Sequence, residues 1–327
     1  MRKILFVLLL FMPTTFLFAQ EGKTTFDYLM LPVSAHAAAL GGTNVSFIEP
    51  DVSLVFNNPA FLGYEMDKQL NLNYMSYLGD IGMGNVAFGK SINDRTTIGL
   101  GVNYVNYGNM IETSEDRTVL GDLKANDITG NVFLSRDFTD YLRGGITAKF
   151  IYSNYHHNTS IGLGVDLGLS YYNPDTEFSW GIVAKNLGRQ VKAYEDESAN
   201  LPWDIQIGMS KKLSKAPIRF SFTGLYLKQW SFENPNGEKD SFFKTLAKHF
   251  IIGVDILPSD NFWIGVGYNI KRGMDMHLQE GNKFAGFSAG AGLKVRAFSF
   301  GISYAKYHPN ANSLIFSLSS SFAELGL

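Results

Sequence analysis

Cysteine is absent from the 327-residue chain, and charge is scarce: Asp, Glu, Lys and Arg make up 18% of residues, with a formal net charge of −2. Without cysteine there is no disulfide scaffold, thiolate zinc site, cysteine nucleophile or iron–sulfur cluster. The near-neutral charge gives no electrostatic reason to expect nucleic acid as a partner. Mean hydropathy is −0.03, and only the N-terminus approaches ~18 consecutive apolar residues, which argues against a bundle of membrane helices.

The N-terminus has the layout of a secretory signal peptide. Two basic residues follow the initiator Met, Ile4–Met12 form a short apolar core, and Ala19 offers a small residue for cleavage. A retained membrane anchor is the alternative, but the apolar run is short and no stop-transfer pattern follows it. We therefore expect residues 1–19 to be removed when the protein is exported.

Beyond about residue 69, apolar residues alternate with small or polar ones. Ile98, Leu100 and Val102, for example, alternate with Gly99 and Gly101. A period of two is the pattern of strands, and helical spacing fits these windows poorly. Turn-forming residues interrupt the pattern at short intervals. About fourteen strands are predicted, over roughly residues 69–79, 82–92, 95–110, 124–138, 141–157, 160–174, 177–188, 202–213, 217–232, 246–258, 261–272, 284–296, 298–307 and 312–322.

Three features separate a membrane barrel from a soluble sandwich. Many predicted strands have ten or more residues, whereas globular strands have about five or six and a tilted bilayer-spanning strand about 9–11. Their non-apolar side is largely Gly, Ser, Thr and Asn, as in a barrel interior. Aromatic residues, although common in any strand, gather near the strand ends and suit a membrane–water interface. They are Tyr74, Tyr77, Tyr104, Tyr107, Tyr152, Tyr155, Tyr171, Tyr172, Tyr226, Trp230, Tyr304 and Tyr307.

We therefore predict an all-β fold: a transmembrane antiparallel β-barrel of about 14 strands in the outer membrane, formed by residues 69–327. Closure removes sheet edges and pairs every backbone group within the hydrocarbon. Short turns usually face the periplasm and long links the cell surface. The expected short turns lie near residues 80–81, 93–94, 139–140, 175–176, 215–216, 259–260 and 297. The expected surface links are 111–123, 189–201, 233–245 and 273–283, either as solvated loops or as a docking surface for a partner.

Residues 20–68 do not follow the strand pattern and are predicted to fold into the lumen as a plug. Val33–Leu40 favour a short helix, because Ser34 is a suitable N-cap and alanine is a strong helix former. Gly41 and Gly42 would end that helix. A segment of this size would fill an interior otherwise lined by glycine.

The stretch from Tyr28 to Leu62 resembles the PorQ family, a group of outer-membrane barrels in the type IX secretion system of Bacteroidetes. Part of it is the looser signature of the wider FadL-like superfamily of long-chain fatty-acid transporters. The residues of that signature are Gly41, Gly42, Asn58, Pro59 and Ala60. Chain length and strand count suit a FadL-like barrel along the whole chain.

The resemblance implies a non-catalytic component of the cell-surface attachment complex, surrounded by outer-membrane lipid. In that family picture PorU removes the C-terminal signal of secreted cargo and joins the cargo to anionic lipopolysaccharide, and PorV shuttles cargo. The PorQ-like barrel holds PorZ at the surface. The alternative is a FadL-like channel that takes up hydrophobic compounds, and a general porin is a weaker third reading.

No catalytic, cofactor-binding or metal-binding site is predicted. Only His156 and His157 are adjacent among the six histidines, and neighbouring strand residues point to opposite faces. No Gly-x-Ser-x-Gly elbow precedes a helix. The Gly-x-Gly runs lie within strands, so they are not phosphate loops and more simply allow close packing inside the barrel. We therefore expect a protein that is not an enzyme and carries no cofactor.

Several charged residues are expected to face the lumen. They are Asp127, Asp166, Asp204 and Asp255, beside Lys149, Lys185, Lys294 or Arg296. Buried charges persist when they are paired, so internal salt bridges are the preferred interpretation. A substrate path lined by these groups is the alternative.

Overall fold

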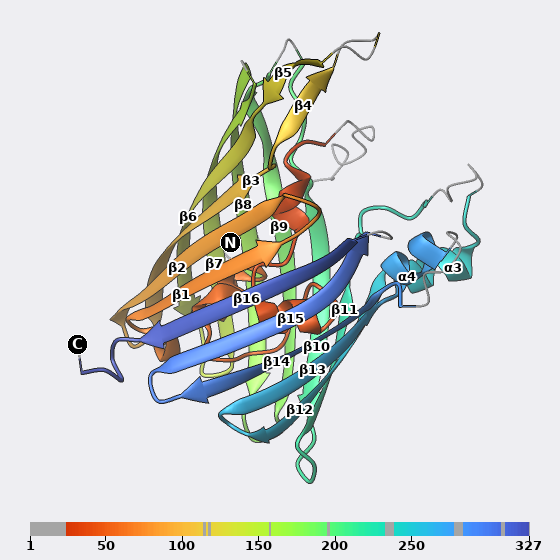
Figure 1. The fold of residues 1–327 in the computed structure, drawn as a ribbon. Coiled ribbons are helices and arrows are strands. Elements are labelled where there is room, and N and C mark those ends of the chain that lie inside the picture. Colours follow the sequence, from red (N-terminus) through yellow and green to blue (C-terminus); the bar gives the residue numbers. More distant parts are fainter. Residues whose placement is uncertain are drawn as a thin grey trace, which may run out of the picture.

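The structure is a computed structural model that describes residues 24–326, except 114–115, 117–118, 157, 195–196, 233–238, 278–283 and 309–310. The predicted signal peptide, residues 1–19, lies outside the described residues. Fourteen antiparallel strands close into a barrel (Figure 1). No helix among the described residues is both long and apolar enough to cross a bilayer.

The barrel closes because the first strand pairs with the last, from Gln69 opposite Ser321 to Ser76 opposite Leu314. Its strands are β1 (Gln69–Ser76), β2 (Gly82–Asn93), β3 (Thr96–Asn106), β6 (Ala125–Asp137), β7 (Leu142–Tyr155), β8 (Asn158–Asn173), β9 (Phe178–Lys192), β10 (Asp204–Lys212), β11 (Ile218–Gly224), β12 (Phe250–Ser259), β13 (Phe262–Asn269), β14 (Phe287–Val295), β15 (Phe298–His308) and β16 (Ala311–Ser321). The predicted barrel of about 14 strands is confirmed. The main error in length is β11, which ends at Gly224 rather than at residue 232.

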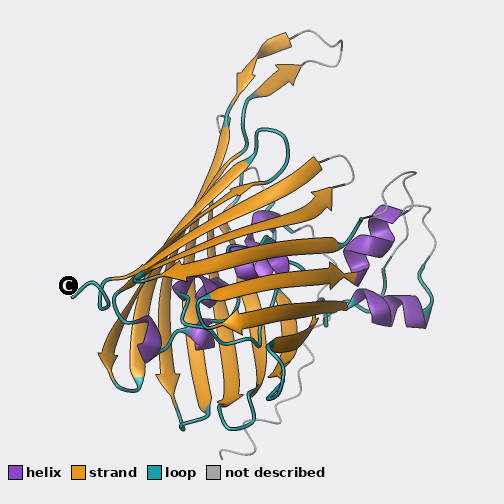
Figure 2. Ribbon diagram, turned by 60° about the horizontal axis from the view of Figure 1, so that its bottom comes forward, coloured by secondary structure: helices purple, strands orange, loops and turns teal. Residues whose placement is uncertain are grey.

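Connections at the two ends of the barrel differ in length, and we call these ends the short-turn end and the long-loop end. All four predicted surface links lie at the long-loop end. Three of them contain structure that the strand pattern did not indicate: the hairpin β4 (Met110–Thr113) and β5 (Val119–Leu123), the helix α3 (Phe242–Lys248) and the helix α4 (Ile270–His277). The hairpin projects beyond the wall and the helices stand to one side (Figure 2).

Two expectations about the connections were wrong. The turn near 80–81 lies at the long-loop end, because β1 starts at the short-turn end and runs away from it. The last residues of the predicted strand 261–272 belong to α4, where the Asn269 side chain accepts a hydrogen bond from Arg272 N at 2.9 Å. An Asn at a helix start satisfies a backbone donor that a strand end would leave open.

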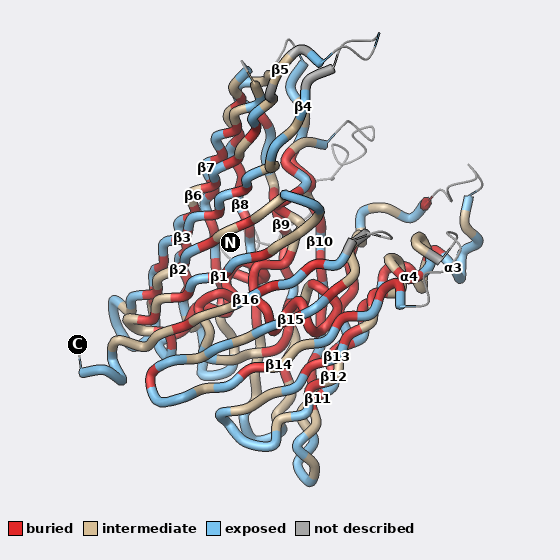
Figure 3. Tube along the Cα trace, viewed as in Figure 1, coloured by how far each residue is buried: buried red, intermediate tan, exposed pale blue. Residues whose placement is uncertain are grey.

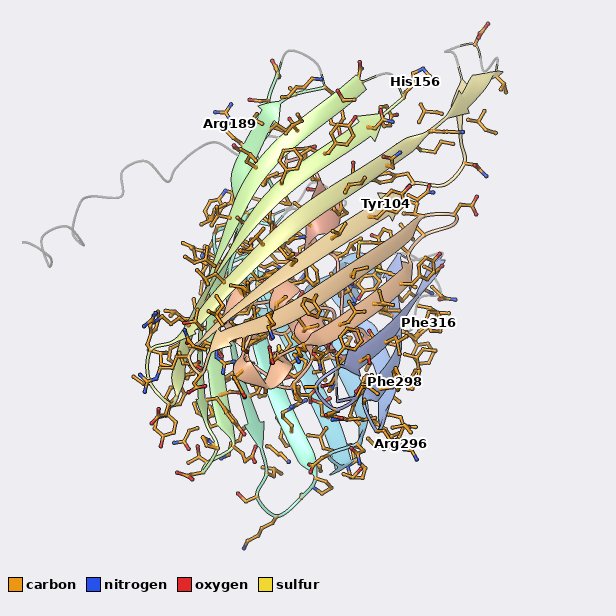
Figure 4. All side chains as sticks on the ribbon, turned by 90° about the vertical axis from the view of Figure 1, so that its left-hand side faces the viewer. Tyr104, His156, Arg189, Arg296, Phe298 and Phe316 are labelled. Carbon is orange, nitrogen blue, oxygen red and sulfur yellow. The ribbon has the colours of Figure 1, made fainter. Side chains whose placement is uncertain are left out.

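The alternation of the strands sorts their side chains between lipid and lumen. Ile98, Leu100 and Val102 face outward and their neighbours inward, and the same alternation of buried and exposed residues is visible on β3, β6 and β7 at the left of Figure 3. Figure 4 shows side chains at both rims, with Tyr104 toward the long-loop end and Phe298 toward the short-turn end.

The predicted aromatic belt is confirmed for part of its members. Tyr74, Tyr104, Tyr152 and Tyr304 are exposed on the outward-facing side of their strands, whereas Tyr155 and Trp230 are exposed at the long-loop end. Three others, Tyr77, Tyr107 and Tyr307, instead pack against the buried core. The Tyr107 hydroxyl donates to Asp127 at 2.6 Å, and the Tyr307 ring lies under Arg272, 4.1 Å from its guanidinium carbon. Polar partners inside the barrel therefore draw these rings away from the membrane.

The N-terminal segment runs through the lumen from the long-loop end to the short-turn end. We call residues 24–68 the plug. It starts where Thr25 N donates to Asn200 O at 3.1 Å, and it ends where β1 begins. Its elements are η2 (Asp27–Met30), α2 (Ala35–Ala39), η3 (Val52–Phe56), η4 (Pro59–Phe61) and η5 (Tyr64–Met66). Nearly all of its apolar side chains are buried, so the hydrophobic core of this protein is the contact between plug and wall.

The predicted helix at Val33–Leu40 is present as α2. Ser34 occupies the N-cap position, but its side chain makes no capping bond, and its hydroxyl has no hydrogen-bond partner in the described part of the chain. Packing against the wall therefore holds this short helix, since one turn and a half of alanine-rich helix is unstable alone.

Candidate functional site

The Asn-Pro-Ala turn of the plug is seated directly on the backbone of the wall. Asn58 Oδ1 accepts from Ala60 N at 3.0 Å, and Asn58 Nδ2 donates to Leu169 O of β8 at 3.2 Å. A Cβ added to Gly145 of β7 would lie 2.3 Å from the carbonyl carbon of Pro59. Glycine on the wall thus allows backbone-to-backbone approach, and asparagine supplies the hydrogen bonds that fix it.

The Gly-Gly pair ends α2 in a conformation that other residues rarely adopt. Gly41 and Gly42 have φ angles of 108° and 111°, and a Cβ on Gly41 would lie 2.2 Å from Cγ2 of Ile251 in β12. Arg272 of α4 reaches down and donates to Gly41 O at 3.4 Å. The two halves of the sequence signature therefore hold the plug at two different places. Gly41 lies against β12 and Gly42 against Arg272 and Tyr307, whereas Asn58, Pro59 and Ala60 lie against β7 and β8.

Four charged residues join the plug to the wall in a closed ring, which we call the latch: His36 and Glu49 from the plug, Arg219 from β11 and Asp255 from β12. His36 Nδ1 contacts Glu49 at 2.8 Å and Nε2 contacts Asp255 at 2.7 Å. Arg219 Nη2 contacts Asp255 at 2.7 Å and Glu49 at 2.8 Å. Positive and negative groups alternate around the ring, so its formal charge is zero when His36 is protonated.

Aromatic rings enclose the latch. The His36 ring stacks on Trp263 of β13 with centroids 3.8 Å apart, and the Arg219 guanidinium lies 4.8 Å from the ring centre of Phe47. The His36 side chain is 4% exposed. Contacts made in such an enclosed site are stronger than in water, and an unpaired charge there is costly.

Geometry and electrostatics agree that His36 is protonated. Both of its ring nitrogens face carboxylate oxygens, which accept hydrogen bonds and cannot donate them when ionised. Burial works against the charged form, but the Glu49 and Asp255 carboxylates outweigh it and raise the pKa of His36 to about 9. Burial likewise opposes ionisation of Glu49, yet His36 and Arg219 lower its pKa to about 2.

A pH dependence follows from these two pKa values. The raised pKa of His36 contributes stability that is complete below its unfolded value of about 6.5 and is lost as the pH rises through about 9. The full contribution is on the order of 3 kcal/mol. We expect the urea midpoint of the refolded barrel to fall over this window. His36→Gln should lose that pH dependence, and an unchanged pH profile in this variant would contradict the assignment.

The glutamate acts in the opposite direction on the pH scale. The lowered pKa of Glu49 contributes stability above its ordinary value of about 4.5, and this is lost as the pH falls through about 2. The latch is therefore strongest between the two ordinary values, in mildly acidic solution.

Only some of the charged residues predicted to face the lumen form the expected salt bridges. Asp166 and Lys149 form an ion pair at 2.8 Å, which confirms that prediction. Asp255 instead pairs with Arg219, which the prediction did not include. Lys185 donates to the carbonyl of Phe56 in the plug at 2.9 Å, and Asp204 accepts from Tyr226 N at 2.9 Å.

Two of the predicted lumen cations lie at the short-turn end. Lys294 pairs with Glu324 at 2.8 Å, and Arg296 is exposed in the β14–β15 turn (Figure 4). Lys294 lines a cavity of about 490 Å³ at this end of the lumen, as strand parity predicts, whereas Arg296 lies in the turn where the chain has left the wall.

The latch residues gave little signal in the sequence. His36 stands in an alanine-rich helix, and Arg219 is one cation between two apolar strand residues. The useful signal was inward parity: Arg219 lies between outward-facing Ile218 and Phe220, so its charge needs a negatively charged partner inside the barrel.

Of the two histidines considered as metal ligands, His156 lies in the β7–β8 turn and His157 lies outside the described residues. Within the described part of the chain, no cluster of three or more acidic or histidine side chains could hold a metal ion.

Two cavities, of about 490 and 370 Å³, lie at the short-turn end of the lumen and share Glu49, Glu65 and Tyr172 in their linings. Toward the other end, a cavity lined by Tyr28, Leu29 and Phe56 measures about 10 Å³, room for about one water molecule. The plug therefore separates an aqueous vestibule at the short-turn end from the long-loop end.

An apolar outer wall, aromatic rims and a closed antiparallel sheet define an outer-membrane β-barrel, here with a lumen occupied by its own N-terminal segment. The chain belongs to the family described as type IX secretion system membrane protein PorP/SprF, whose sequence profile matches residues 131–320. It is thus an outer-membrane component of that secretion system. No curated protein matches the sequence.

Solved structures show the same fold. The toluene transporter TodX of Pseudomonas putida is 12% identical, with a TM-score of 0.58 over 92% of this chain and 100% of that one. A FadL homologue of Pseudomonas aeruginosa is 14% identical, with a TM-score of 0.53 over 90% of this chain and 99% of that one. The predicted FadL-like architecture is therefore confirmed, and at this identity the likeness concerns the fold alone.

Proposed function

We propose that this chain is a PorQ-like, non-catalytic anchor of the attachment complex. It holds a PorZ-like surface protein at the outer membrane, next to PorU and PorV, so that secreted cargo is processed and joined to anionic lipopolysaccharide. The observation that carries the proposal is the plug, which is fixed to the wall by the latch and by the Asn58 turn. A barrel filled in this way serves better as a rigid base than as a conduit.

The long-loop end supplies the elements that would hold a partner. The β4–β5 hairpin extends β3 and β6 beyond the wall, and Ile111 and Val119 on one of its faces are each 64% exposed. A two-stranded ribbon is marginally stable by itself, and β-branched residues on an exposed ribbon suit contact with another protein surface. Surface loops on a rigid scaffold commonly carry binding residues.

Crosslinking in native outer membranes tests this proposal. The tagged barrel is crosslinked, purified in mild detergent, and analysed by mass spectrometry. We expect recovery of a PorZ-like surface protein, with crosslinks to the connections 107–124, 193–203, 225–249 or 270–286. Lys212 and Lys294, toward the short-turn end, are the internal controls and should give no crosslink to that protein.

The opposite result is equally defined. A barrel that purifies without a surface protein and carries a fatty acid or another apolar molecule would contradict the anchor and support uptake of hydrophobic compounds.

One observation favours this second function, the uptake of hydrophobic compounds. The β8–β9 pairing is irregular, and Asn186 of β9 has a φ of 55°, so the wall is kinked there. Against it, Asn186 Nδ2 donates to Pro202 O at 3.2 Å, which closes β9 to the segment before β10.

A further inference from the structure

Helix α3 exposes apolar side chains and buries polar ones, the opposite of a surface helix on a soluble protein. Phe242 and Phe243 are 65% and 79% exposed, while Thr245 and Lys248 are buried. A helix that hides its cation and presents two phenylalanines needs an apolar environment on its outer face. Contact with water would favour the opposite orientation, with Lys248 exposed and the two phenylalanines buried.

The orientation is held by charges between α3 and α4. Buried Lys248 forms ion pairs with Asp240 and with Asp275 of α4, the latter at 2.8 Å. Lys271 contacts the same Asp275 at 2.6 Å and lies 5.3 Å from the ring centre of Phe232. Rotating α3 to hide its phenylalanines would expose Lys248 and leave two carboxylates without this partner. The exposed phenyl groups are therefore part of a fixed arrangement.

The apolar face continues the lipid-facing surface of the barrel. Phe250 begins β12 two residues after α3, and Phe287 begins β14; both face outward. Phe287 packs on Tyr268 of β13 with ring centroids 4.7 Å apart. Phe284, just before β14, is 72% exposed. The aromatic rim of β12–β14 thus runs directly into the segments next to the two helices, which stand outside the barrel (Figure 2).

We propose that α3 and α4 form a membrane-surface anchor, with Phe242, Phe243 and Phe284 inserted among the acyl chains of the leaflet at the long-loop end. In the usual orientation of such barrels this is the outer leaflet. Aromatic side chains at the boundary of headgroups and acyl chains, carried by a helix parallel to the membrane, are a common form of interfacial binding. Lys244, exposed on α3, supplies a cation for lipid phosphates.

The anchor goes beyond the proposed function and does not depend on it. It would tie the longest connection, residues 225–249, to the membrane plane on one side of the barrel. The β4–β5 hairpin on the opposite side then remains the part that projects into solvent. A protein docked on the phenylalanines is the competing occupant, and the experiment separates the two.

Because the chain lacks cysteine, single spin labels can be placed without altering the background. Phe243→Cys and Phe284→Cys report on the anchor, Val132→Cys reports lipid on the outer wall of β6, and Val119→Cys reports solvent on the hairpin. Labelled barrels are placed in phosphatidylcholine nanodiscs, and collision rates with oxygen and with a water-soluble nickel chelate are compared. Heat-modifiable electrophoretic mobility verifies that each variant is folded.

We expect labels at 243 and 284 to favour oxygen over nickel, as at 132, with the opposite sign at 119. Nickel accessibility at 243 and 284 equal to that at 119 would overturn the proposal. A second result would also overturn it: labels that are accessible to nickel in nanodiscs and become shielded only when surface proteins extracted from the native outer membranes are added. The phenylalanines would then be covered by protein. Phe242→Cys is the replacement position if Phe243→Cys does not fold.

Discussion

Asp255→Asn is expected to lower the free energy of unfolding by about 3–5 kcal/mol, the range for removing one partner from a buried ion pair. The asparagine amide would face the donors of Arg219 and His36, and the ring would keep a net positive charge. Both effects act inside the lumen, where Asp255 is fully buried. Urea unfolding of the barrel refolded in lipid vesicles measures the loss, and cleavage of the plug by added protease reports whether it has loosened.

A surface ion pair provides the matched control. Lys294→Met breaks the partly exposed pair with Glu324 and should cost no more than about 1 kcal/mol. The double variant Arg219→Met with Asp255→Leu removes one charge of each sign and leaves the contact of His36 with Glu49. It should cost less than the two single replacements added together. Equal effects of Asp255→Asn and Lys294→Met would refute the latch.

Gly145→Ala is expected to unseat the Asn-Pro-Ala turn and open a path through the lumen. The new Cβ would lie 2.3 Å from Pro59 C and 2.4 Å from Ala60 N. Backbone atoms cannot swing aside as the end of a long side chain can, so the plug must move. Overpacking of this kind costs about 1–3 kcal/mol or more. Single-channel recordings in planar bilayers should show a larger conductance than that of the wild type.

Gly130→Ala on the neighbouring strand β6 makes the same chemical change where nothing lies within 4 Å of the new methyl group. This variant should match the wild type in conductance and in urea midpoint. If Gly145→Ala behaved in the same way, the seating of Pro59 against β7 would not be what holds the plug. Heat-modifiable mobility of both variants separates a displaced plug from a barrel that has not folded.

The sequence predicted the wall far better than the latch. Side-chain alternation is a local property, repeated every second residue, so fourteen strands and their lipid-facing residues could be read directly. His36 and Asp255 are 219 positions apart, and no local pattern relates them. Their contact depends on where α2 lies in the lumen and on which strand places a carboxylate next to His36. Parity could place Arg219 and Asp255 inside, but not beside each other.

The local sequence pattern also gave wrong predictions where a residue makes a contact with a distant part of the chain. The strand expected to reach residue 272 becomes α4, because Asn269 caps the helix and Asp275 meets both Lys271 and Lys248 of α3. Tyr107 and Tyr307 turned inward because Asp127 and Arg272 offered polar partners there. In each case a single long-range contact outweighed a weak local preference.

By itself, the sequence determined the period of the strands, the turn residues between them, the short helix before Gly41 and Gly42, and the resemblance of the plug motif. These depend on interactions between near neighbours along the chain. Tertiary structure alone decided the closure of β1 on β16, the pairing of charges in the lumen, and the glycines that the plug backbone touches. Those contacts exist only after distant strands meet, because burial then makes each unpaired charge or misplaced methyl group costly.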